Sequence, residues 1–90
     1  MKVLTQAIHF KADVKLLEFI QKKLDKLELF YDRVIDAEVY LHLLNTSDKE
    51  NKMIELKLRV PGETFMVKKQ ATTFEECIDL CAEVAGQKRS

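Results

Sequence analysis

Strict alternation between apolar and polar side chains over residues 35–43 limits the possible folds more than any other feature of the sequence. The apolar residues are Ile35, Ala37, Val39, Leu41 and Leu43, and the polar residues between them are Asp36, Glu38, Tyr40 and His42. Because successive side chains of a strand point to opposite faces of a sheet, this segment is predicted to be a strand with one buried and one solvent-facing side. Residues 54–60 repeat the pattern, with Ile54, Leu56, Leu58 and Val60 as the apolar set. A sheet built from these strands needs a covering layer on one face.

Two segments have the periodicity of amphipathic helices and can form that layer. The first follows Asp13, which can cap a helix, and runs to about Leu29. At ~100° per residue, its apolar stripe consists of Leu16, Leu17, Ile20, Leu24, Leu27 and Tyr31. The second begins at residues 72–75, Thr-Thr-Phe-Glu, which have the spacing of a capping box. Its predicted buried stripe consists of Phe74, Cys77, Ile78, Cys81 and Val84.

The remaining segments complete the order strand, helix, three strands, helix (βαβββα). Residues 2–8 alternate loosely, residues 45–51 form a polar connection, and the pattern resumes at Phe65 and Val67 after a Pro61-Gly62 turn. A helix between the first two strands predicts that they are parallel, and the short later connections predict antiparallel neighbours. We therefore expect an α+β fold with a four-stranded mixed sheet and both helices packed on one face. The buried face is predicted to hold Val39, Leu41, Leu56 and Leu58, and the open face Tyr40, His42, Lys57 and Arg59.

Length and composition indicate one domain spanning residues 1–90. A chain of 90 residues with 47% hydrophobic and 33% charged residues can build a single core but not two. No apolar segment approaches the ~20 residues of a membrane span, and the N-terminus lacks the apolar run of a signal peptide. We therefore expect a cytoplasmic protein with no membrane partner. Cys77 and Cys81 are expected to be reduced and to pack like small hydrophobic side chains.

Charge is distributed unevenly along a chain whose formal net charge is zero. Residues 11–26 contain five lysines, whereas residues 75–83 contain four acids and no base. On the first helix, Lys15, Lys22 and Lys26 fall within about 40° of one another, and Lys23 lies at the border of the apolar stripe. Such a ridge can neutralise the phosphates of a nucleic acid. The alternative is an ordinary solvated face, which the residues alone favour.

Residues 19–33, FIQKKLDKLELFYDR, resemble the bacterial ribosome hibernation-promoting factors, also called ribosome-associated inhibitor A or sigma-factor modulation proteins. Residues 73–79, TFEECID, extend the resemblance into the second helix, and the family has the same order of elements. The resemblance implies a noncatalytic factor that silences translation during slow growth. It implies binding to ribosomal RNA of the small subunit, in the channel for messenger and transfer RNA, through basic side chains of the helices. Lys23 and Lys26 fall on matching positions, so the resemblance favours phosphate binding by the ridge.

The candidate RNA-binding residues extend beyond the first helix. Arg33 follows the helix within the matched segment, and its guanidinium can bind phosphate or pair with Asp32 or Asp36. Residues 84–87 are uncharged where the family continues with a basic segment, so either the chain is a trimmed version of a longer one or it makes fewer phosphate contacts and binds more weakly. Lys88 and Arg89, near the end of the chain, would join the same surface if the second helix lies beside the first. The full set is Lys15, Lys22, Lys23, Lys26, Arg33, Lys88 and Arg89.

Other kinds of site have little support in the sequence. There is no Gly-rich phosphate loop and no nucleophile beside a base, so we expect no enzyme activity, cofactor or small-molecule substrate. The histidines lie on different elements from the cysteines and there is no Cys-x-x-Cys pair, so no metal site is expected. The alternative function is a noncatalytic protein-protein interaction module that uses the open sheet face or the acidic second helix. Salt separates the two, because phosphate binding weakens steeply with salt and an apolar protein contact does not.

Overall fold

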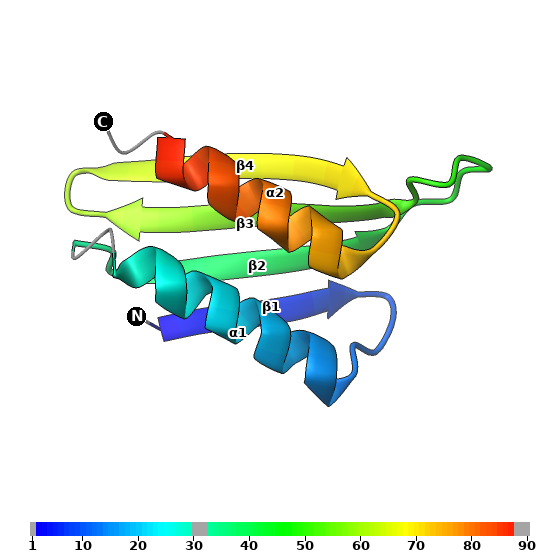
Figure 1. The fold of residues 1–90 in the computed structure, drawn as a ribbon, viewed down its shortest axis with the longest axis horizontal. Helices are drawn as coiled ribbons and strands as arrows, with labels where there is room; N and C mark the ends of the chain where they lie inside the picture. The colour runs from blue at the N-terminus through cyan, green and yellow to red at the C-terminus, as the bar shows by residue number, and fades with distance from the viewer. Residues whose placement is uncertain (1, 30–32, 88–90) are drawn as a thin grey trace.

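Four strands form one mixed sheet, in which they lie side by side in the order of the chain (Figure 1). The computed structural model describes residues 2–29 and 33–87. Its strands are β1 (Lys2–Ile8), β2 (Asp36–Leu43), β3 (Lys52–Val60) and β4 (Glu63–Ala71), and its helices are α1 (Val14–Glu28) and α2 (Phe74–Gln87). β1 pairs with β2 in parallel, and the β2–β3 and β3–β4 pairs are antiparallel. The predicted βαβββα order and mixed sheet are confirmed.

Both helices cover the same face of the sheet, with α1 over β1 and β2 and α2 over β3 and β4 (Figure 1). The core between the two layers includes the predicted strand residues Val39, Leu41, Leu56 and Leu58, all buried. On the opposite face Tyr40, His42 and Lys57 are partly exposed and Arg59 is exposed. The predicted assignment of the two faces is therefore confirmed. None of the described helices is long and apolar enough to cross a membrane.

Among residues 2–29 and 33–87, left-handed backbone conformations occur at two connections. Gly62 (φ 79°) follows Pro61 in the turn between β3 and β4, and glycine adopts this conformation without a steric penalty. His9 (φ 64°) lies between β1 and α1 and takes the same conformation with a side chain attached. The next residue, Phe10, stacks on Phe74 at the start of α2, with the ring centroids 5.5 Å apart. The connection between β1 and α1 is thus packed against the second helix.

Helix α1 begins where the sequence predicts, but the stripe of buried side chains on it is narrower than predicted. The Asp13 side chain accepts a hydrogen bond of 2.7 Å from the backbone N–H of Leu16, as expected for a capping residue. Leu24 is fully buried, whereas Leu17, predicted to share its stripe, is 37% exposed. At ~100° per residue, Leu17 points about 60° away from the mean direction of the buried side chains, so the sheet does not cover it. Tyr31, the last predicted member of the stripe, lies outside the described residues.

Helix α2 is capped one residue later than residues 72–75 predict. The backbone N–H of Glu76 donates to the hydroxyl of Thr73 at 3.1 Å, and the N–H of Cys77 donates to the Thr73 carbonyl at 3.1 Å. The capping residue is therefore Thr73, and the third residue after it is Glu76 rather than Glu75. The Glu76 carboxylate accepts a bond of 3.0 Å from the Thr72 hydroxyl. Both threonines thus hold Glu76, which favours the start of the helix at Phe74.

The two cysteines of α2 face the sheet as free, buried thiols. The Cys77 Sγ donates to the carbonyl of Lys52 at 3.1 Å, and the Cys81 Sγ donates to the carbonyl of Ile54 at 3.9 Å. Burial raises the pKa of Cys77 to about 11 and that of Cys81 to about 12. The predicted packing of both thiols in the core is confirmed.

Truncation of two leucines on α1 should separate the buried stripe from its exposed edge. Leu24→Ala removes a fully buried side chain and should lower the free energy of unfolding by about 2–5 kcal/mol. Leu17→Ala removes a partly exposed one and should cost no more than about 1 kcal/mol. Urea denaturation followed by circular dichroism measures both changes. Equal losses in the two variants would show that Leu17 belongs to the core.

The thiols should make stability fall at alkaline pH. Above pH ~9 the unfolded chain loses thiol protons that the folded protein retains, because burial raises both folded-state pKa values. The unfolded state then binds fewer protons, so the free energy of unfolding decreases as the pH rises from about 9 to 11. Urea midpoints at pH 8 and pH 10 measure this decrease. The Cys77→Ala/Cys81→Ala variant should show a smaller decrease than the natural sequence, and an equal one would contradict the argument.

Candidate nucleic-acid interface

Three lysines of α1 project from the outer side of the helix. Lys15, Lys22 and Lys26 are all exposed, because the opposite side of α1 packs its apolar stripe on the sheet. From Lys15 to Lys26 the helix rises by ~16 Å at ~1.5 Å per residue. The row of ammonium groups is therefore long enough to face several phosphates of a nucleic-acid backbone. We refer to Lys15, Lys22 and Lys26 as the cationic ridge.

Lys23 differs from the ridge because its charge is already engaged. Its Nζ lies 2.6 Å from Oδ1 of Asp79 on α2 and 5.4 Å from the centroid of the Phe19 ring. The Lys23 side chain is 33% exposed and that of Asp79 is 50% exposed. The predicted position of Lys23 at the border of the apolar stripe places it between the two helices. There it joins α1 to α2 instead of extending toward solvent.

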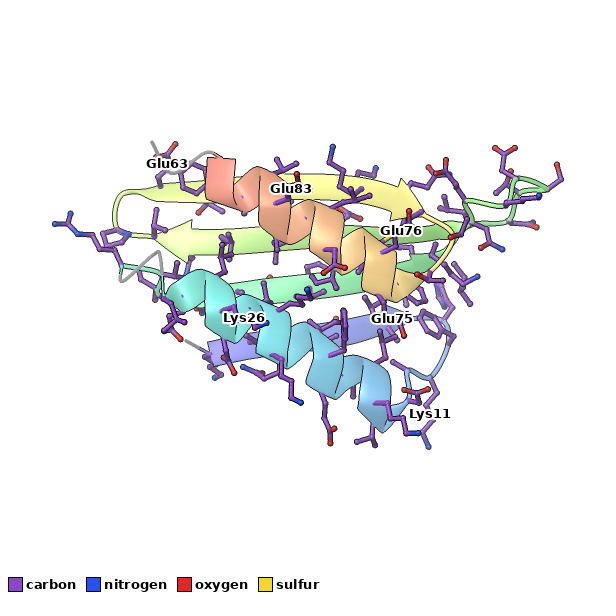
Figure 2. All side chains as sticks on the ribbon, in the orientation of Figure 1. Lys11, Lys26, Glu63, Glu75, Glu76 and Glu83 are labelled. Carbon is purple, nitrogen blue, oxygen red and sulfur yellow. The ribbon has the colours of Figure 1, made fainter. Side chains whose placement is uncertain are left out.

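A groove of about 350 Å³ separates the outer surfaces of the helices. From α1 it is lined by Lys23, Lys26 and Leu27, and from α2 by Asp79, Ala82, Glu83 and Gly86. The acids of α2 are all exposed, and they comprise Glu75, Glu76, Asp79 and Glu83. Figure 2 labels Lys26 on α1 and three of these acids along α2. The cationic ridge is thus bordered by negative charge on the side that faces α2.

Of the other predicted RNA-binding residues, the structure describes Arg33 alone. Arg33 is exposed beyond the end of α1. Asp36, one of its two predicted partners, binds Arg59 instead, through Nε–Oδ1 and Nη2–Oδ2 distances of 3.1 and 2.5 Å. Asp32, Lys88 and Arg89 lie outside the described residues. The structure therefore brings Lys15, Lys22 and Lys26 together on one helix.

On the open sheet face, basic and acidic groups contact one another. The Tyr40 hydroxyl donates to the Glu38 carboxylate at 2.6 Å, and this hydrogen bond raises the pKa of Tyr40. The buried Nε2 of His42 lies 2.8 Å from Oε1 of Glu55, without the alignment of a hydrogen bond. Arg59 is bound to Asp36 on the same face. These pairs make the face less suited to phosphate than the cationic ridge is.

Sequence reasoning does not identify the partner of Lys23, because the sequence presents Asp79 only as one acid of the second helix. A signal for the pairing exists, since two helices on one sheet face must lie flank to flank, and Lys23 borders the apolar stripe of its own helix. No three metal-binding side chains gather among residues 2–29 and 33–87.

Solved structures with this fold include two proteins from different organisms. One is a ribosomal subunit interface protein from Coxiella burnetii, with a TM-score of 0.85 and 17% sequence identity over 98% of this chain and 92% of that one. The other is the N-terminal domain of Thermus thermophilus Protein Y, with a TM-score of 0.81 and 19% identity over 99% of this chain and 96% of that one. At such low identity these similarities establish the fold alone.

Comparison with curated proteins gave no significant match. The sequence model of one protein family, however, matches residues 3–88 and therefore nearly the whole chain. Apart from Lys2, the first residue of β1, the match covers every described helix and strand, including the cationic ridge of α1. The chain therefore belongs to the sigma 54 modulation protein / S30EA ribosomal protein family.

Proposed function

We propose that this chain is a noncatalytic factor that binds the small ribosomal subunit and silences translation during slow growth. The observation that carries the proposal is the family match over residues 3–88. One structural relative, from Coxiella burnetii, is a ribosomal subunit interface protein, which supports the same kind of partner. We further propose that the domain acts in the cytoplasm by occupying the channel for messenger and transfer RNA, without chemical change to the ribosome.

In this proposal the cationic ridge supplies the contact with ribosomal RNA. Lysine ammonium groups neutralise backbone phosphates without reading the base sequence, and they release bound counterions as they do so. Lys15, Lys22 and Lys26 meet the requirement that such groups be exposed and lie on one side of a rigid element. Arg33 extends the surface beyond the end of α1. Lys88 and Arg89 stay proposed members of the same surface.

The contact should be modest in strength and sensitive to salt. The chain has no net charge, and α2 presents four acids beside the ridge, so few phosphates can be neutralised. Binding by occupancy of a channel requires only that the domain be held in place. A small number of phosphate contacts is compatible with this role and favours release when growth resumes.

Removal of ridge charges should weaken binding to purified small subunits. In the Lys22→Ala/Lys26→Ala variant, the slope of log affinity against log salt concentration should become shallower by about 1.4–1.8, since each lost phosphate contact removes ~0.7–0.9. Both side chains are exposed, so the fold should be unchanged. Cosedimentation with small subunits across a salt series measures the slope, and circular dichroism checks the fold.

The matched control is Lys49→Ala/Lys68→Ala, which makes the same change in net charge. Lys49 lies in the loop before β3, and Lys68 is exposed on β4. If both double variants lose affinity equally, or if neither loses any, the ridge is only a solvated face. The protein-protein interaction module, with the open sheet face or α2 as its docking surface, would then be the better explanation.

A further inference from the structure

The ion pair between Lys23 and Asp79 separates Lys23 from the other lysines of α1. Its Nζ is 2.6 Å from the Asp79 carboxylate, and its side chain is two-thirds buried between Phe19 and α2. The exposed lysines of the cationic ridge have no such restriction. One of the positive charges of α1 is therefore neutralised by α2 before any polyanion arrives.

An approaching phosphate meets this pair as a neutral unit with a carboxylate at its surface. The Asp79 side chain is half exposed and lines the groove next to Lys26, so its charge opposes phosphate binding at that lysine as well. For Lys23 itself to bind phosphate, its ammonium group must either leave Asp79 or share its N–H donors between the two, and in both cases the Asp79 carboxylate lies close to a second negative charge. Both effects lower the affinity for a polyanion.

The fold does not depend on this pair. A partly exposed ion pair contributes little to stability, and the two helices are held in place by their buried stripes on the sheet. Ala82 and Leu27 also line the groove between the helices. The charge of Asp79 can therefore be removed while the position of α2 is kept, which makes its effect on binding measurable.

We propose that Asp79 sets the affinity of this domain for RNA by holding the ammonium group of Lys23 in an ion pair across the two helices. Asp79 is a positioning residue in this role, since it acts through Lys23 and need not touch the RNA. The inference rests on the proposed function. It implies that affinity is limited by a contact inside the protein and can rise through the loss of one charge on the acidic helix.

The test is the Asp79→Asn variant, measured with purified small ribosomal subunits between 50 and 200 mM potassium chloride. A freed Lys23 adds one phosphate contact, so the logarithmic salt slope should steepen by about 0.7–0.9. Over this fourfold range the variant should lose about threefold more affinity than the natural sequence loses, and it should bind more tightly at the low-salt end. Asp79→Ser serves as a second variant with the same expected result. The thermal midpoint should stay within a few degrees of the natural value.

Two controls separate the ion pair from a general change of charge. Glu83→Gln removes one acid from the same groove, and Glu63→Gln removes one at the start of β4 that is not among the residues lining the groove (both are labelled in Figure 2). Neither acid pairs with Lys23, so both substitutions should change the salt slope less than Asp79→Asn does. In a Lys23→Ala background, Asp79→Asn should change the slope no more than Glu83→Gln does, because only the repulsion of phosphate by a groove carboxylate is then removed.

The outcomes distinguish this inference from the function on which it rests. If Asp79→Asn behaves like Glu83→Gln, or keeps its effect without Lys23, the ion pair is not the cause, while ribosome binding still stands. If the natural protein and all variants show no salt-dependent binding to small subunits, the proposed function fails, and the inference fails with it.

Discussion

Burial of one face of β2 and β3 under two helices is the constraint on which the other features of the structure depend. Val39, Leu41 and Leu56 are fully removed from solvent, and each such side chain stabilises the fold by about 1.5–3 kcal/mol. A shift of one residue in either strand would expose the whole apolar set, so the strand register is strongly specified. With the register set, the apolar stripes of α1 and α2 must face the sheet. The cationic ridge and the acids of α2 are then turned outward, side by side.

The outer surface of the helices consequently carries two opposite charges along one groove. Net charge conceals this arrangement, because the acids and bases of the chain are equal in number. A polyanion can approach α1 only with the acids of α2 next to it. Electrostatic repulsion from α2 therefore restricts how the domain can be oriented on RNA and how strongly it is held. Family members that differ in the charge of the second helix should differ in both respects.

Patterns local in the sequence predicted most of the fold, and contacts between elements were predicted less well. Alternation over residues 35–43 and 54–60 predicted two strands and their faces, because the period of a strand is insensitive to its neighbours, but Ile35 and Leu43 at the ends of the first pattern are half exposed. The exposure of Leu17 depends on how wide a stripe of α1 the sheet covers, and the choice of Thr73 as the capping residue depends on a difference of one position, which a capping motif with two adjacent threonines does not resolve. The pairing of Lys23 with Asp79 depends on how two helices lie against each other. The partner class came from the resemblance of residues 19–33 to a family, since neither charge nor spacing selects a ribosome.

The position of β1 at an edge of the sheet has a consequence for how the chain folds. β3 and β4 are joined by the short turn at Gly62, so their pairing requires the closure of only a small loop. β1 reaches β2 only after α1 has crossed the sheet, and it has no second strand to hold it. The antiparallel part of the sheet should therefore assemble early, with the parallel pair added late. In the folded protein, the strand that was added last should detach first. The backbone amides of β1 should therefore exchange with solvent before those of the other strands.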